Sequence, residues 1–132
     1  MKRSTYLLLA GIIALSIGTF ALFAPVTLLA SKGVVSVAAN VWIQEVGALL
    51  IAIGMLAAMV RHHEDSPTLK AILISNVVIQ IGLLSIEALA YHDGIITRLS
   101  GIVPNLILHI CLASGLIYYI VKMPNFSSRK VG

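Results

Sequence analysis

The sequence predicts an all-α integral membrane protein, a bundle of four transmembrane helices, from three observations. Hydrophobic residues make up 59% of the 132 residues and charged residues only 11%, whereas a typical soluble domain has about 25% charged residues. Two segments, 4–31 and 99–121, contain no charged residue, and each exceeds the roughly 20 apolar residues that cross a bilayer as a helix. The apolar runs are also continuous and do not alternate with polar residues, which excludes the pattern of a membrane β-barrel.

The first span is expected at about 6–29. Pro25 has no backbone N–H, so we expect a kink or an early stop near the end of this helix. The basic start resembles a signal peptide, but the apolar run is longer than the roughly 7–15 residues of such a segment, so we expect the helix to be retained. Small residues recur at steps of three and four and predict a face for close helix packing; they are Gly11, Ala14, Gly18 and Ala21.

The remaining spans are expected at about 37–60, 68–91 and 99–121. Gly47 and Gly54 lie on one face of the second span and again predict close packing. Ser66 is an N-cap residue and Pro67 suits the first helical position, so the third span begins there. The turn signal at 92–94, His-Asp-Gly, separates the third span from the fourth.

The basic residues predict the orientation of the bundle. Four spans place both chain ends and the loop between the second and third spans on one side of the membrane. That side carries Lys2, Arg3, Arg61, Lys70, Lys122, Arg129 and Lys130, and the other side carries Lys32 and Arg98. Positive residues favour the cytoplasm, so we expect a multi-pass protein of the bacterial inner membrane with both termini inside. A polar tail from about residue 122 completes the single domain, 1–132.

Several function classes have no support in the sequence. The formal charge of +4 does not indicate nucleic-acid binding, because the basic residues lie singly or in pairs at the ends of apolar runs. A Ser-His-Asp order, a glycine-rich phosphate loop and a CxxC motif are all missing, so no catalytic residue is predicted. The lone Cys111 excludes an internal disulfide and behaves as a small packing residue.

The informative residues are the polar ones inside the apolar spans. A charged side chain at the bilayer centre costs about 2.5–3.5 kcal/mol on insertion scales, yet Glu45 and Glu87 both lie within spans. Helical geometry places Asn76, Gln80 and Glu87 on one face of the third span. Asn105 and His109, four residues apart, share a face of the fourth span, as Asn40 and Gln44 do on the second.

These residues lie at a similar depth, in the middle and outer half of the membrane. Polar residues in spans normally face the bundle interior, so we predict one polar pocket near the outer face. Its expected residues are Glu45, Asn76, Gln80, Glu87, Asn105 and His109. Glu45 points away from Gln44 and can serve a different neighbour.

The pocket has several chemical interpretations. A carboxyl group and a histidine, which changes charge near neutral pH, can relay protons, bind a cation or hydrogen-bond a quinone head group. A metal site is not predicted, because the only strong ligands are Glu45, Glu87 and His109, from three helices without a short-range motif. The alternative is that the polar side chains only hydrogen-bond the helices to one another.

Some short motifs carry a family resemblance. A basic start, a first helix ending in Ala24-Pro25, the segment 42–47 (Trp-Ile-Gln-Glu-Val-Gly) and the Asp93-Gly94 turn resemble the DoxX-like group of small bacterial four-helix membrane proteins. They are most similar to an uncharacterised branch in which an acidic residue opens the second helix, and Glu45 matches that position. Some members of the group are linked to quinone-dependent sulfur oxidation or to redox complexes, so the resemblance implies a quinone as a candidate cofactor.

The sequence thus predicts a binding or accessory membrane protein with an outer-leaflet polar pocket for a small amphiphile such as a quinone or lipid. The alternatives are a proton-coupled transporter of a small molecule, with Glu45 or Glu87 as the proton carrier, and a subunit of a redox complex. An enzymatic reaction is not predicted. The expected partners are membrane lipid, a quinone or other amphiphile, and further copies or subunits in a larger membrane complex, but no nucleic acid.

Overall fold

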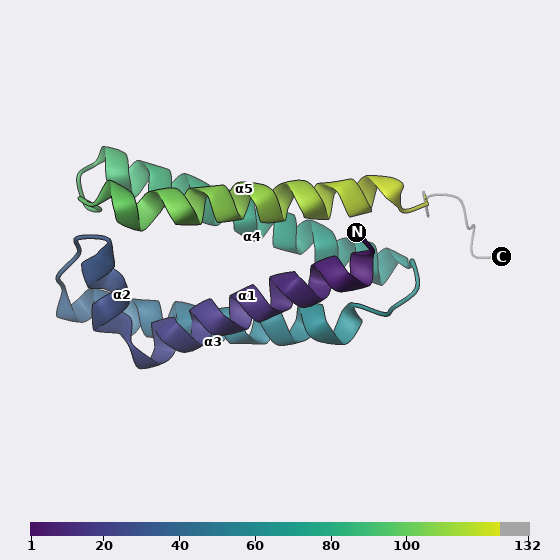
Figure 1. The fold of residues 1–132 in the computed structure, drawn as a ribbon, viewed down its shortest axis with the longest axis horizontal. Coiled ribbons are helices and arrows are strands. Elements are labelled where there is room, and N and C mark those ends of the chain that lie inside the picture. Colours follow the sequence, from purple (N-terminus) through teal and green to yellow (C-terminus); the bar gives the residue numbers. More distant parts are fainter. Residues whose placement is uncertain (125–132) are drawn as a thin grey trace.

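The computed structural model describes residues 1–124, and within them the chain is all-helical, as predicted. The helices are α1 (Arg3–Phe23), α2 (Pro25–Ser31), α3 (Val37–Val60), α4 (Pro67–His92) and α5 (Leu99–Lys122) (Figure 1). All but α2 are long and apolar enough to cross a membrane. Most of the polar tail expected after residue 122 falls on 125–132, outside the described residues.

The first predicted span is not one helix, because it breaks at Pro25. α1 ends at Phe23, and the short helix α2 begins at Pro25 itself. Proline lacks the backbone donor and also disfavours helical geometry in the residue before it. Ala24 accordingly has φ −132° and ψ 49°, outside the helical region. The kink or early stop expected near Pro25 is therefore confirmed, as a full break that divides the predicted span 6–29 between α1 and α2. The other three spans lie within a residue of their predicted bounds.

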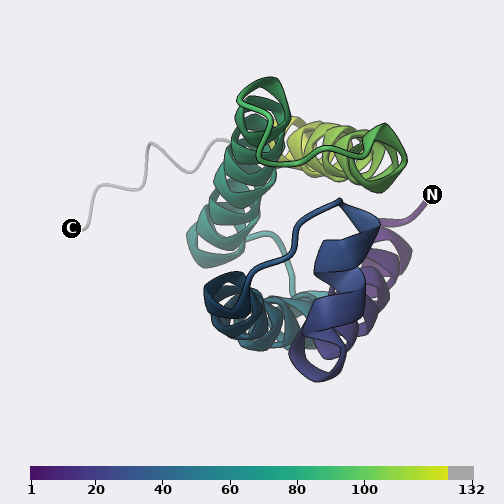
Figure 2. The ribbon, with the colours of Figure 1, turned by 90° about the vertical axis from the view of Figure 1, so that its left-hand side faces the viewer.

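The four long helices form two pairs, α1 with α3 and α4 with α5, which lie one above the other (Figures 1 and 2). The small-residue faces bring the first pair together, as predicted. A Cβ atom on Gly11 would lie 2.9 Å from the carbonyl oxygen of Gly54, and one on Gly47 would lie 2.8 Å from that of Gly18. Only glycine permits backbones to approach this closely, so these four positions determine the α1–α3 crossing.

The two pairs meet at the end of the bundle that holds both ends of the described chain, here called the termini end. The Tyr6 hydroxyl of α1 donates a hydrogen bond to the Leu112 carbonyl of α5 at 2.5 Å. The Tyr6 ring lies against Gly115, where a Cβ would overlap it. Nearby, the Tyr119 hydroxyl donates to the Met1 carbonyl at 2.9 Å. A small apolar core surrounds these contacts and includes Leu7, Val60, Leu69, Leu73 and Leu116.

The pairs meet again at the opposite end, here called the α2 end. The Lys32 carbonyl accepts from the backbone N–H of Thr97 at 3.1 Å and of Arg98 at 3.3 Å. The Arg98 guanidinium donates to the Ala30 carbonyl at 3.0 Å, and Gly101 at the start of α5 lies against the backbone of Ser31. The two helix pairs are thus joined at both ends, and the space between these joints lies in the middle of the bundle.

The outward faces of the spans are apolar. Large hydrophobic side chains are exposed at mid-span on every long helix, among them Ile12, Leu49, Val78 and Ile107. In water such a surface would aggregate, but the hydrocarbon of a bilayer solvates it. The outer surface therefore fits a multi-pass membrane protein.

Candidate functional site

A cavity of about 320 Å³ lies between the two helix pairs. Its α1 and α3 walls are apolar and include Ile13, Ile17, Ile43, Leu50 and Ile53. The polar groups come from the opposite side, and they are Asn76, Gln80 and Glu87 of α4, Asn105 and His109 of α5, and Lys32 after α2. The cavity is thus apolar on one side and carries hydrogen-bonding groups on the other.

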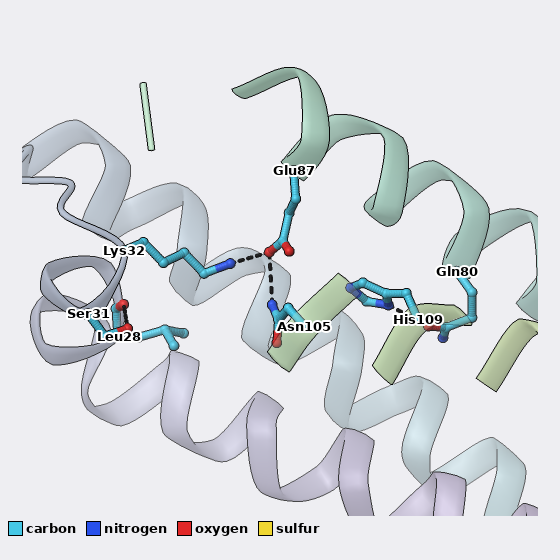
Figure 3. Close-up of polar contacts among 7 residues, drawn as sticks. All are labelled: Leu28, Ser31, Lys32, Gln80, Glu87, Asn105 and His109. Carbon is cyan, nitrogen blue, oxygen red and sulfur yellow. Dashed lines mark hydrogen bonds and ion pairs between the residues drawn. The ribbon is translucent and has the colours of Figure 1, made fainter. Parts of the chain in front are cut away.

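The first polar cluster lies toward the α2 end and centres on Glu87. Its Oε1 accepts from the Lys32 ammonium and, at 2.8 Å, from the Asn105 amide nitrogen (Figure 3). The Lys32 and Glu87 side chains are only 11% and 15% exposed, so the ion pair is largely removed from solvent. Glu87 Oε2 is buried and has no hydrogen-bond partner among the described residues. The carboxylate therefore has unused acceptor capacity in an apolar setting.

The break at Pro25 explains how Lys32 reaches Glu87. Because the chain turns at Ala24, α2 leaves the line of α1 and leads toward the start of α5 (Figures 1 and 2), and Lys32 follows directly at its C-terminal end. Gly33 has φ +77°, a left-handed conformation that glycine adopts readily, and this reverses the chain immediately after Lys32. The backbone bonds from Thr97 and Arg98 then hold Lys32 beside α4 and α5.

The second polar cluster lies deeper in the bundle. His109 Nδ1 is 2.6 Å from Gln80 Oε1, and both residues are 9% exposed (Figure 3). Since the amide oxygen can only accept, this contact requires the proton on Nδ1. Asn76 also lines the cavity, but its amide nitrogen donates to the Ile72 carbonyl one turn earlier at 3.0 Å.

Five of the six predicted pocket residues line this cavity, and Glu45 does not. Glu45 is exposed on the outer surface of α3. The reason is helical geometry: Glu45 precedes Gly47 by two residues, so it points to the opposite side of the helix, and Gly47 packs against α1. Placing Glu45 in the pocket was therefore wrong. The nearby Gln44 bonds its amide nitrogen to the Leu22 carbonyl at 3.0 Å and joins helices.

The expected pocket residues did not include Lys32, whose charge served only to predict the orientation of the bundle. The structure leaves this residue only 8% exposed and places its ammonium on Glu87. The sequence did contain a signal for this pairing. Lys32 is one of only two basic residues on its side of the membrane, and Glu87 lies near the same side. Opposite charges at one depth of a membrane tend to pair.

Metal binding gains no support from the geometry. In residues 1–124, no three side chains of His, Cys, Asp or Glu come together. The cavity can instead hold a small organic molecule, with its polar part against Glu87, Lys32 and Asn105 and its apolar part against α1 and α3.

Comparisons with models of known protein families, with curated proteins and with solved structures give no match. The resemblance to the DoxX-like group therefore stays a prediction.

Proposed function

We propose that this chain binds a small amphiphile in the cavity between the two helix pairs. The observation that carries the proposal is the cavity itself, which is apolar along α1 and α3 and takes its polar groups from α4, α5 and Lys32. Ligand pockets are usually of this kind, mostly apolar with a few well-placed polar groups, and span roughly 300–1,000 Å³. At about 320 Å³, the cavity suits a single ring or a short chain with a polar head. A two-chain lipid would not fit inside it.

Access to the cavity is expected from the hydrocarbon. Two of its lining side chains, Phe20 of α1 and Ile86 of α4, are 45% and 65% exposed, so the cavity extends to the protein surface. These side chains lie within spans, where the surrounding medium is lipid. A molecule with an apolar body can therefore enter laterally and bring its head group to Glu87.

We place the α2 end at the outer face of a bacterial inner membrane, with the termini end in the cytoplasm. Lys2, Arg3, Arg61, Lys70 and Lys122 belong to the termini end. Of the two basic residues at the other end, Lys32 is buried and paired with Glu87. Lys32 therefore adds no exposed charge at the α2 end, and the larger number of basic residues at the termini end favours this orientation.

Transport of a small molecule is the second candidate, and one observation favours it. The cavity lies between two joints, one made by Tyr6 and Gly115 at the termini end and one by Lys32 and Glu87 at the α2 end. Opening the two joints in turn would expose the cavity to alternate sides. Uptake of the ligand into liposomes, lost in Glu87→Gln, would support transport over simple binding.

The proposed binding is tested by blocking the cavity. Ala14 of α1 lines it, and Ala14→Phe fills part of its volume, whereas Ala52 of α3 is exposed and does not line it. We expect mass spectrometry to find an amphiphile that co-purifies with the wild type and with Ala52→Phe but not with Ala14→Phe. Equal occupancy in the two variants would refute binding in this cavity.

A further inference from the structure

The two charges of the ion pair differ in their freedom to move. Glu87 lies within α4, five residues before its end at His92, and its side chain is two methylene groups shorter than that of lysine, so it reaches less far from its helix. Lys32 lies at the end of a helix of 7 residues, followed by Gly33. A lysine ammonium on its flexible stem readily turns toward water at a membrane interface. The carboxylate is thus the fixed charge, and the ammonium is the exchangeable one.

The surroundings of Glu87 define what can replace Lys32. In the part of the chain that the structure describes, Lys32 and Glu87 are the only lysine, arginine, aspartate or glutamate side chains that line the cavity. Asn105 supplies one donor to Oε1, and Oε2 receives none. Once Lys32 turns outward, the carboxylate needs a cation with several donors, because an unpaired charge in an apolar setting is costly. A protonated amine, with up to three N–H donors, meets this need.

We propose that the ligand of this cavity is a cationic amphiphile, a protonated amine on a compact apolar body. This inference rests on the amphiphile site proposed above. The ligand nitrogen takes the place of the Lys32 ammonium on Glu87, and Lys32 turns out to the water at the α2 end. The apolar body lies against α1 and α3. An anionic head would lie beside the Glu87 carboxylate and is disfavoured, and a hydroxyl head would leave the ion pair intact.

Three probes of one shape separate these head groups: 1-aminoadamantane, 1-adamantanol and adamantane-1-carboxylate. Their binding to the full chain in lipid nanodiscs is measured by equilibrium dialysis, with empty nanodiscs subtracted for partition into lipid. We expect the amine to bind at least about tenfold more tightly than the alcohol, a difference typical of one added charge-assisted contact. The carboxylate is expected to bind most weakly.

Two variants test the exchange itself. Glu87→Gln keeps the side-chain shape and should reduce amine affinity to that of the alcohol, without changing the affinity for the alcohol. Lys32→Met removes the internal competitor and should raise amine affinity. A merely structural ion pair would instead make Lys32→Met bind the amine more weakly.

The matched controls are Glu45→Gln, a membrane glutamate outside the cavity, and Lys70→Met, a lysine of α4 that does not line it; both should bind the probes as the wild type does. If Lys32→Met does not fold, the ratio of amine affinity to alcohol affinity still decides the proposal. This ratio should be high in the wild type and in Glu45→Gln, and should fall to about one in Glu87→Gln. If the wild type binds the amine and the alcohol equally and Ala14→Phe binds neither, the cation preference is overturned and the amphiphile site is still supported. If Ala14→Phe binds every probe as tightly as the wild type does, both the cation preference and the amphiphile site are overturned.

Discussion

The crossing of α1 and α3 permits a sharp prediction at Gly47. A Cβ atom there would lie 2.8 Å from the Gly18 carbonyl oxygen, 2.8 Å from the Leu22 nitrogen and 3.2 Å from the Ala21 carbonyl carbon. All three neighbours are backbone atoms of α1, so no side-chain rotation relieves the contact. The substitution Gly47→Ala must therefore push the two helices apart.

The expected cost follows from this geometry. Overpacking a tight contact typically costs about 1–3 kcal/mol. Alanine is a better helix former than glycine by roughly 1 kcal/mol in water, which offsets part of that cost. We therefore expect Gly47→Ala to lower the free energy of unfolding by about 0–2 kcal/mol relative to the wild type, and by about 1–3 kcal/mol relative to a glycine-to-alanine change in open space, where the gain in helix propensity has no packing cost.

The measurement is unfolding in mixed micelles as the fraction of denaturing detergent rises, followed by circular dichroism. Gly82→Ala is the matched control, because nothing lies within 4 Å of a Cβ at Gly82, and it should leave stability unchanged or slightly raised. If Gly47→Ala and Gly82→Ala unfold at the same point, the glycine crossing does not hold the α1–α3 pair together and the reasoning fails.

Three further outcomes follow from other contacts. Tyr6→Phe removes the hydroxyl that donates to the Leu112 carbonyl at 2.5 Å and should destabilise the protein by about 1 kcal/mol in the same unfolding assay; an unchanged midpoint would show that this bond does not join the helix pairs. Asp65→Asn weakens the ion pair between Arg3 and Asp65, whose side chains are 22% and 38% exposed, respectively. The free energy of unfolding should fall by only about 0.2–1 kcal/mol, and by less at high salt; a decrease that does not depend on salt would contradict this expectation. Glu45→Gln should leave occupancy by a co-purifying amphiphile at the wild-type level in mass spectrometry, since Glu45 lies outside the cavity; a lower occupancy would mean that the ligand binds elsewhere.

Much of the candidate site follows from local geometry. Asn76, Gln80 and Glu87 share a face of α4 because one helix imposes a single periodicity on them, and the same holds for Asn105 and His109 on α5. Bilayer energetics then direct both faces inward. The placement of these five residues in one cavity could thus be predicted from spacing, depth and bilayer energetics together, whereas their role as a binding site remains a proposal.

Glu45 shows where that reasoning stops. Its depth matches that of Glu87, but depth does not specify the side of the helix that faces the interior. That side is determined by the partner of α3, and α3 packs on α1 through Gly47 and Gly54. Both glycines were recognised as packing residues, and combining them with helical geometry would have placed Glu45 on the outer surface.

By itself, the sequence determined the four spans and the break near Pro25, because hydrophobic length and the missing proline donor act locally. The tertiary structure alone decided that the helices pair as α1 with α3 and α4 with α5, leaving a cavity between the pairs. It also decided that Lys32 bonds to Glu87, 55 residues later in the chain. Pairings of this kind depend on the direction in which α2 leaves Pro25 and on the conformation of Gly33, and these are set by contacts with Thr97, Arg98 and Gly101. Side-chain spacing along the chain carries no information about such distant contacts.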